Sequence, residues 1–223
     1  MLAPPTPDAV RENALAVAAR AAILVEGWSD QSALQTLAKR RGHDLDSERI
    51  VVVPTGGVTN VGHFAAALGP HGIGLPLAGL YDAPEQRQLG NALRRAGMAV
   101  GDSNDGLEAL GFFACDADLE DELIRALGAS AVERLLDGQG ELDSFRVFQS
   151  QPEQRGRSIE AHLRRFMGTR SGRKIRYGTL LVASLPLDRV PQSLDRVLVY
   201  AQDGARRTTW RTTPHPLVGS KSQ

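Results

Sequence analysis

The stretch "AILVEGWSDQSALQTLAKRRG", Ala22 to Gly42, decides the fold. Its first six residues are an apolar run closed by Glu-Gly, which is typical of a buried strand. The rest opens on Ser-Asp, has apolar residues at helical spacing, and ends on basic residues and a glycine. Those are the start and stop signals of a capped helix. The stretch therefore predicts a strand followed directly by a helix.

The same pattern recurs along the next hundred residues. Further strands are expected at 49–57, 76–82 and 110–118, and further helices at 60–72, 85–97 and 119–138. Strands that alternate with helices indicate parallel strands joined by helical crossovers. We therefore predict an α/β fold with a mainly parallel sheet between layers of helices.

The remainder of the chain is less regular and more basic. Residues 158–185 look helical with a basic interruption, "GTRSGRK", and a closing helix is expected at 186–201. We divide the chain into an N-terminal segment, partly disordered; an α/β core; a helical basic C-terminal part; and a flexible tail. Their bounds are 1–20, 21–140, 141–200 and 201–223.

The composition is that of an ordinary globular protein, with 42% hydrophobic and 23% charged residues. No apolar run approaches the roughly 18 residues of a membrane span, and no signal peptide is recognisable. The single cysteine, Cys115, excludes an internal disulfide and suggests a buried thiol. We expect a cytoplasmic protein with no membrane contact.

The net charge is zero, but the charge is unevenly distributed. Residues 1–150 hold 12 basic and 21 acidic residues, whereas residues 151–223 hold 14 and 5. Two solvated faces that neutralise each other by packing together would explain this. An acidic cation site beside a basic surface that binds a polyanion would explain it as well.

Acids follow three of the four expected strands. Glu26 ends the first and Asp82 the third, and the stretch "DADLEDE" follows the fourth. Because ligands of parallel sheets bind outside the carboxyl ends of the strands, these acids can converge on one site. Carboxylate oxygens are ligands of hard cations such as Mg²⁺.

Each acid also has a structural explanation. Asp30, in the first helical turn, can reach the same cation as Glu26 or can serve as a helix cap. Asp82 can form the turn before Pro84. In "DADLEDE" the helix dipole accounts for two or three acids but poorly for five. Glu122 lies three residues before Arg125 and is expected to form a surface pair with it.

Two further segments can bind anions. Gly56 and Gly57 lie between a strand and a helix, where they form either a structural turn or a phosphate-binding loop. The stretch "GTRSGRKIRYG" is either a solvated loop or a basic patch that binds a phosphate group. Its four basic residues are Arg170, Arg173, Lys174 and Arg176. The five histidines show no metal-ligand spacing, which argues against zinc.

Taken in order, "ILVEGWSDQSAL", "VVVPTGGVTNVGHFAAAL", "LAGLYDA" and "DLEDEL" resemble the Toprim domain of the OLD (overcoming lysogenisation defect) nuclease family. The resemblance covers about residues 21–200. It implies a Toprim-like sheet and metal-dependent cleavage of DNA as an endonuclease or nickase, with two Mg²⁺ or Mn²⁺ ions. The family's proteins usually contain an ABC-type ATPase, and no Walker A motif is present here. The resemblance thus indicates a stand-alone Toprim protein or one that works with a separate ATPase. Homo-oligomers of the chain are a further expected partner state.

The resemblance also assigns roles to residues. The family's acidic motifs match Glu26, Asp30, Asp82, Asp118 and Glu120. The resemblance implies that these residues are metal ligands and that Glu26 is also catalytic. Lys174 matches the family's basic residue and would offset charge on the scissile phosphate. The basic segment 155–176 would follow the DNA backbone without reading bases.

One position departs from the family pattern. Pro84 occupies the second acidic position of the family's D-x-D motif, and Asp116 or Glu85 could replace the missing acid. This departure keeps a second hypothesis open, in which the chain is a weak or inactive Toprim module that binds nucleic acid or a partner ATPase. Toprim chemistry of another kind, primer synthesis or topoisomerisation, is a third; no tyrosine-bearing breakage domain is evident.

Overall fold

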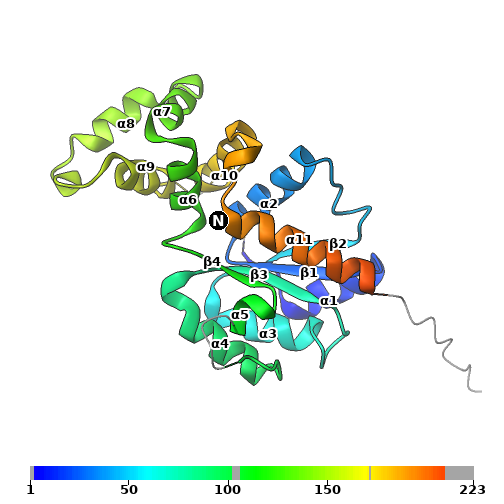
Figure 1. Ribbon diagram of the computed structural model, residues 1–223. Coiled ribbons are helices and arrows are strands. Elements are labelled where there is room, and N and C mark those ends of the chain that lie inside the picture. The colour runs from blue at the N-terminus through cyan, green and yellow to red at the C-terminus, as the bar shows by residue number, and fades with distance from the viewer. Residues whose placement is uncertain (1–2, 102–105, 171, 209–223) are drawn as a thin grey trace, which may run out of the picture.

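A computed structural model describes residues 3–101, 106–170 and 172–208. Its centre is a sheet of four parallel strands in the order β2-β1-β3-β4 (Figure 1). The strands are β1 (Ala21–Val25), β2 (Ile50–Pro54), β3 (Leu77–Asp82) and β4 (Phe112–Cys115). Strands β2, β3 and β4 lie inside segments where the sequence predicts strands, and β1 begins one residue before the expected start at Ala22. The predicted α/β fold with a parallel sheet is confirmed.

Helices connect and cover the strands. The first group is α1 (Pro7–Ala16), α2 (Trp28–Arg40), α3 (Val58–Leu68), α4 (Gln86–Arg95) and α5 (Gly106–Ala109). The second is α6 (Leu119–Leu127), α7 (Ala129–Gly138), α8 (Leu142–Gln149), α9 (Ile159–Gly168), α10 (Arg173–Ser184) and α11 (Gln192–Arg207). In the described residues, every helix is too short or too polar to cross a membrane.

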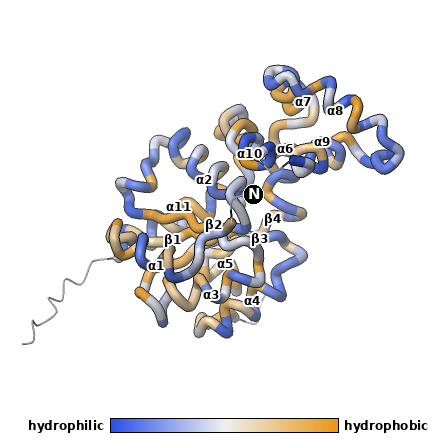
Figure 2. The backbone as a smooth tube through the Cα atoms, turned by 180° about the vertical axis from the view of Figure 1, so that it is seen from behind, coloured by the Kyte–Doolittle hydropathy of each residue, from blue (hydrophilic) through white to orange (hydrophobic). Residues whose placement is uncertain are grey.

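Helices cover both faces of the sheet, which explains why its strands are nearly continuous apolar runs. Along β1, Ile23 faces a core shared with α2, α10 and α11, whereas its neighbour Leu24 faces a core shared with α1, α3 and α4. Successive side chains of a strand point to opposite faces, so one short run supplies both cores. Figures 1 and 2 show these two helical layers on either side of the sheet.

The helical part differs from the expectation in three places. The helix expected at 119–138 is divided into α6 and α7 by Gly128, whose φ of 88° interrupts a right-handed helix. The short helix α8 had no clear sequence signal. Finally, α11 continues to Arg207 because Ala201 and Ala205 are buried on its inner face, so residues 201–207 are not part of the tail. The rest of the expected tail, 209–223, lies outside the described residues.

Helices α7, α8 and α9 form a lobe that projects from the sheet (Figure 1). Three aromatic rings hold it together. Phe166 of α9 packs against Phe145 and Phe148 of α8, with ring centroids 5.3 and 5.6 Å apart. Tilted and edge-on contacts of this kind are favourable beyond the area that they bury. We call these three helices the helical lobe.

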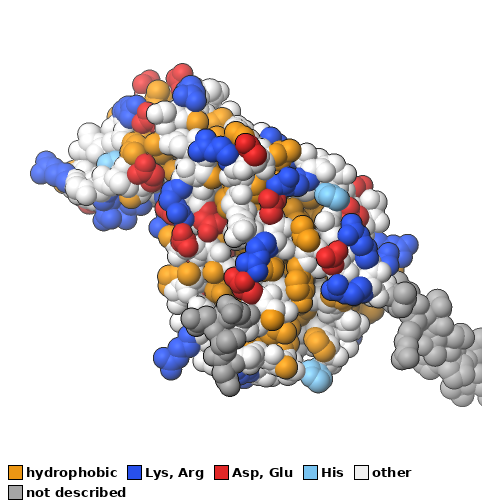
Figure 3. Space-filling view, in the orientation of Figure 1, with side chains coloured by type: hydrophobic (Ala, Val, Ile, Leu, Met, Phe, Trp, Pro, Cys, Tyr) orange, Lys and Arg blue, Asp and Glu red, His pale blue; other side chains and the backbone are white. Residues whose placement is uncertain are grey.

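The opposite charges of the two parts of the chain meet in ion pairs. Arg164, Lys174, Arg176 and Arg196 of the basic part pair with Asp118, Glu120, Glu141 and Glu108 of the acidic part. Figure 3 shows acidic and basic side chains interspersed on one face of the molecule. The uneven charge along the sequence is therefore neutralised in part by packing in three dimensions.

Candidate metal centre and basic cleft

Two adjacent strands each place an acid at the same edge of the sheet. Glu26 directly follows β1 and is exposed, and Asp82 is the last residue of β3 and is half-buried. The two strands are neighbours and parallel, so their carboxyl ends lie side by side. Burial, then Glu26, then Asp118 and Glu85 raise the pKa of Asp82 to about 7. Burial alone disfavours the charged carboxylate, and the neighbouring acids add to that effect.

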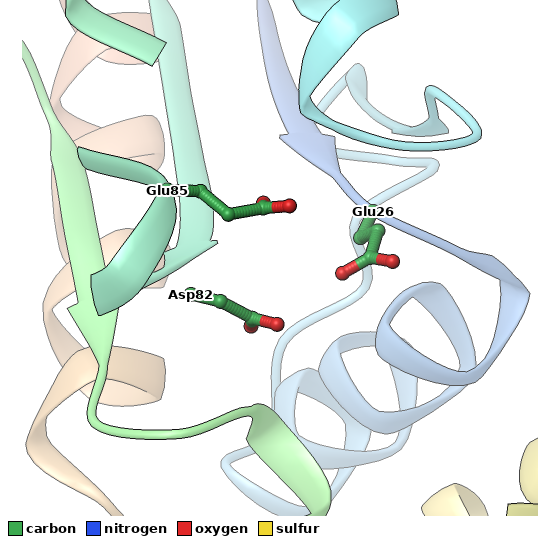
Figure 4. Close-up of side chains that lie close together, drawn as sticks. All are labelled: Glu26, Asp82 and Glu85. Carbon is green, nitrogen blue, oxygen red and sulfur yellow. The ribbon is translucent and has the colours of Figure 1, made fainter. Parts of the chain in front are cut away.

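Glu85 completes a cluster with these two acids. Asp82 begins a short 3₁₀ turn, Ala83–Glu85, in which Pro84 occupies an early position that tolerates proline. The turn brings the Glu85 side chain back toward Glu26 and Asp82 (Figure 4). One carboxylate oxygen from each of the three lies within 4.8 Å of the others. The sequence offered Glu85 only as a replacement for the acid that Pro84 lacks. Burial and Glu26 raise its pKa.

Asp30 lies deeper, in the first turn of α2. Its Oδ2 accepts a hydrogen bond from the backbone N–H of Gly27 at 2.8 Å, so it serves as part of the helix cap. The side chain is buried, and burial followed by the charge of Glu120 raises its pKa. The capping role and a role near a cation are compatible, because the second carboxylate oxygen remains.

Glu120 and Lys174 form an ion pair beside Asp30. Nζ of Lys174 lies 3.2 Å from Oε2 of Glu120, which is almost fully buried in the first turn of α6. Burial opposes the charge on Lys174, but Glu120 and Asp30 outweigh it and raise its pKa, so the ammonium stays protonated. Burial also raises the pKa of Glu120 against the pull of Lys174. The single positive charge of Lys174 thus interacts with two buried carboxyl groups. When both are ionised, a further cation is needed to balance their charge.

Asp118 is held by two partners at the start of α6. Oδ1 accepts from the backbone N–H of Asp121 at 2.8 Å, which caps the helix. Oδ2 lies 2.6 Å from Nε of Arg164 in α9. Asp118 is close enough to Asp82 to raise the pKa of that acid. It therefore faces the acidic cluster but is neutralised by an arginine of the helical lobe.

Asp116 lies apart from the other acids. Its side chain is 78% exposed and pairs with Arg125 at 3.0 Å. Arg125 also binds Asp121, while Glu122 accepts from the Asp116 backbone N–H and from Ser193. These contacts stabilise the turn between β4 and α6. Of the predicted metal ligands, Glu26 and Asp82 belong to the three-carboxylate cluster, whereas Asp30, Asp118 and Glu120 lie outside it with partners of their own and Asp116 is engaged on the surface.

The two loop glycines have a structural explanation. Gly56 and Gly57 have φ values of 76° and 114°, which favour glycine. The Gly56 N–H donates to the backbone oxygen of Glu26 at 2.8 Å, so it extends the pairing of β1 and β2. Pro4 packs so closely on Gly56 that a Cβ there would lie 2.7 Å from its ring. The loop positions Glu26, and the Gly56 amide is already used.

The predicted basic patch is divided between two locations. Arg173 is 6% exposed, pairs with Glu141 at 3.0 Å and stacks on Phe166, and Arg176 also pairs with Glu141. Arg173 is thus buried between α8, α9 and α10, which removes it from the surface that a polyanion can contact. Arg170 is exposed and lines a cleft that includes Glu26 and Lys174.

A second cleft contains cations that the residue-level prediction did not single out. It has a volume of about 400 Å³ and lies between α6, α9 and α10. Its charged lining consists of Asp118, Glu120, Arg157, Arg164, Arg165 and Lys174. We call it the basic cleft. The three arginines lie within the basic segment 155–176, but helical spacing alone does not show which of its arginines face the acids.

Residues 18–83 match the family model described as "Overcoming lysogenization defect protein-like, TOPRIM domain". Residues 18–83 thus correspond to an OLD-like Toprim domain. The matched Toprim segment includes Glu26, Asp30, Gly56, Gly57 and Asp82, and the other site residues lie beyond it. No match was found among curated proteins.

Solved structures extend the likeness of fold beyond the matched Toprim segment. The C-terminal region of the Xanthomonas campestris pv. campestris OLD protein is 23% identical, with a TM-score of 0.65 over 84% of this chain and 97% of that one. The C-terminal region of the Burkholderia pseudomallei OLD protein is 22% identical, with a TM-score of 0.62 over 84% and 98%. The fold of the OLD-like Toprim domain thus includes most of the helical part.

Proposed function

We propose that this OLD-like Toprim domain is a divalent-cation-dependent nuclease that hydrolyses DNA phosphodiesters, cutting internally as an endonuclease or nickase. One observation carries the proposal. Three carboxylates, Glu26, Asp82 and Glu85, converge within 4.8 Å at the carboxyl ends of two neighbouring parallel strands. This edge of a parallel sheet is where ligands bind, and a family model of Toprim type matches the segment that contains Glu26 and Asp82.

The residues present fit a hard divalent cation. The cluster offers only carboxylate oxygens, which Mg²⁺ and Mn²⁺ prefer, and no cysteine or histidine of the described residues joins it. Raised pKa values at Asp82 and Glu85 indicate that the acids repel one another. A cation removes that repulsion. Bound divalent ions would stabilise the charge that develops on the phosphate during hydrolysis.

Each residue has a role in this proposal. Glu26, Asp82 and Glu85 hold one ion. Asp118 and Glu120, assisted by Asp30, would hold a second ion. Lys174 places a permanent positive charge at the mouth of the site and offsets the charge of the scissile phosphate.

The alternative is an inactive Toprim module that binds nucleic acid or a separate ATPase. Pro84 is the feature in its favour, because proline offers no ligand atom. The structure weakens that argument, since the turn containing Pro84 directs Glu85 toward the other two acids. We therefore favour the active enzyme.

A nicking assay separates the two functions. Supercoiled plasmid is incubated with the protein and Mg²⁺ or Mn²⁺, beside the double variant Glu26→Gln/Asp82→Asn. The matched control is Glu12→Gln, an exposed acid of α1 that does not belong to the cluster. We expect nicking by the unmodified protein and by the control, abolished by EDTA and in the double variant. The absence of metal-dependent nicking by the unmodified protein above the level of the double variant would contradict the proposal and favour the inactive module.

A further inference from the structure

The basic cleft holds the acids of the second ion site and the cations of the helical lobe in one space. Its two carboxylates, Asp118 and Glu120, come from the start of α6. Both are already paired, Asp118 with Arg164 at 2.6 Å and Glu120 with Lys174 at 3.2 Å. Among the described residues, no ion pair within 4.0 Å involves the three acids of the first cluster. The first ion site is thus open, and the second is closed by the protein's own cations.

The two closing pairs differ in how easily they can open. Lys174 lies against a buried carboxylate, with 4% of the Glu120 side chain exposed, so separating them would strand a buried charge. The two cations are similarly exposed, Lys174 at 45% and Arg164 at 42%, but the Asp118 side chain is 15% exposed, so its pair with Arg164 is the less buried of the two. A partly exposed ion pair contributes little to stability and exchanges readily with another anion. Arg164 is therefore the removable partner.

Opening this pair does not require the helix to unfold. Asp118 caps α6 through Oδ1, and Arg164 occupies Oδ2. When Arg164 leaves, the capping bond remains and Oδ2 becomes available to a cation. Arg157 and Arg165 line the same cleft. Arg165 is oriented by Gln154 at 3.1 Å and Arg157 by the backbone of Glu153 at 3.2 Å.

We propose that a backbone phosphate of a nucleic acid takes Arg164 from Asp118, and that the freed carboxylate then completes the second cation site. The inference rests on the proposed function, since it assigns the substrate's entry to the same centre. Guanidinium groups bind phosphate through two parallel hydrogen bonds, which favours phosphate over a single carboxylate oxygen. Three arginines side by side suit a repeated phosphodiester better than one isolated anion.

The exchange makes the two ligands cooperate. Nucleic acid raises the affinity of the second cation because it removes Arg164, and the cation raises the affinity for nucleic acid by the same factor. The second ion then binds more tightly when substrate is present. Arg164 acts as a positioning residue that keeps the centre incomplete until a phosphate arrives.

The substitution Arg164→Ala should have opposite effects on the two ligands. Mn²⁺ binding without DNA is followed by calorimetry. Binding of a labelled duplex in EDTA is followed by fluorescence anisotropy at several salt concentrations. We expect about fivefold or more tighter binding of a second Mn²⁺, as for typical coupling energies. We also expect weaker DNA binding, with the salt slope reduced by about 1.

Three controls make the result specific. Arg146→Ala removes an exposed arginine of α8 that pairs with Glu133 outside the cleft. This substitution should change neither the Mn²⁺ affinity nor the DNA affinity. Asp118→Asn added to Arg164→Ala keeps an oxygen for the helix cap and should abolish the gain in Mn²⁺ affinity. Arg164→Lys keeps the charge without the paired donors and should bind DNA with intermediate affinity.

The outcomes decide the proposal independently of nuclease activity. Unchanged Mn²⁺ affinity in Arg164→Ala, or unchanged DNA affinity, overturns the exchange. If inorganic phosphate promotes binding of the second Mn²⁺ by the unmodified protein as strongly as an oligonucleotide does, the cleft is a simple anion site and the nucleic-acid assignment is overturned. If plasmid nicking fails while the opposite effects of Arg164→Ala appear, the exchange stands and only the proposed activity falls.

Discussion

Gly178 of α10 lies directly against the backbone of Ser29 in α2, so closely that a Cβ atom at position 178 would be 2.9 Å from the Ser29 carbonyl oxygen. The contact brings the start of α10 to the first turn of α2. Lys174 precedes Gly178 by four residues, on the same face of the helix. The close approach of the two backbones is therefore what places the Lys174 ammonium beside Asp30 and Glu120.

The substitution Gly178→Ala should separate α10 from α2 and displace Lys174. We expect a loss of about 1–3 kcal/mol in the free energy of unfolding, as for overpacking of a tight contact, with a fall in nicking activity. Urea denaturation and the plasmid assay measure the two effects. Gly138→Ala is the control, because a Cβ there meets no atom within 4 Å and alanine favours a helix. Equal stabilities of the two variants would refute the tight contact.

Lys174→Met should affect both stability and activity. It removes the cation that pairs with the buried Glu120 while retaining much of the side-chain length. Because Lys174 is 45% exposed, we expect a moderate loss of about 1–3 kcal/mol, smaller than for a fully buried pair. Nicking should fall about 100-fold, as when one charge-stabilising donor is removed. Full activity with lowered stability would show that Lys174 is only structural.

Cation binding should strengthen as the pH rises through neutrality. The pKa of Asp82 is raised to about 7, so this ligand is mostly protonated at pH 6 and mostly ionised at pH 8. A cation binds the ionised form, so Mn²⁺ affinity should be about tenfold higher at pH 8 than at pH 6. Calorimetry at several pH values measures the profile. A flat profile over this range would contradict the assigned role of Asp82.

Asp30→Asn should stabilise the metal-free protein at alkaline pH. The pKa of Asp30 is higher in the folded protein than its ordinary value of 3.8, because of burial and Glu120. As the pH rises above 3.8 the unfolded chain loses this proton first, so wild-type stability falls. Asparagine cannot lose a proton, and it can still accept the hydrogen bond of Gly27.

Chemical unfolding in EDTA at pH 5 and pH 8 checks this prediction. We expect Asp30→Asn to gain more stability relative to wild type at pH 8 than at pH 5. The control is Asp143→Asn, an exposed acid in the first turn of α8. A difference between Asp30→Asn and wild type that is the same at both pH values would exclude the raised pKa as its cause.

Arg170→Gln and Arg173→Gln should separate the two functions of the basic stretch. Arg173 is buried between Glu141 and Phe166, and leaving Glu141 with one partner fewer should cost about 2–4 kcal/mol. Arg170 is exposed in the cleft of Glu26, so Arg170→Gln should leave stability unchanged and reduce the salt slope of DNA binding by about 1. Thermal unfolding and anisotropy measure both. The reverse assignment of effects would contradict the structure.

The sequence was informative for features that depend on residues near one another in the chain. The strand and capped helix around Glu26 follow from an apolar run, a Ser-Asp start and a terminal glycine, and the structure has both elements there. The helix at 119–138 was only partly predictable. Its hydrophobic period continues through Gly128, but the backbone turns at that residue and divides the segment into α6 and α7. The convergence of Glu26 and Asp82 was also accessible, since parallel strands end at one edge.

The choice of partners among the charged residues was not accessible in this way. Glu85 joins the cluster through a turn, whereas Asp116, nearer to the other predicted acids in sequence, points toward Arg125. Arg173 and Lys174 are neighbours in sequence, yet one is buried against Glu141 and the other reaches Glu120. Successive residues of a helix point in different directions, and the helices packed around α10 decide what each one meets.

The sequence by itself thus determined the α/β class, the parallel sheet and the edge where acids gather, because these depend on hydrophobic period, capping and strand direction. Only the tertiary structure decided which carboxylates share a cation and which are neutralised by arginine or lysine. Those pairings join residues as far apart as Glu26 and Glu85 or Asp118 and Arg164. They depend on distances of a few ångströms between elements, which the close packing of α2, α6, α9 and α10 sets.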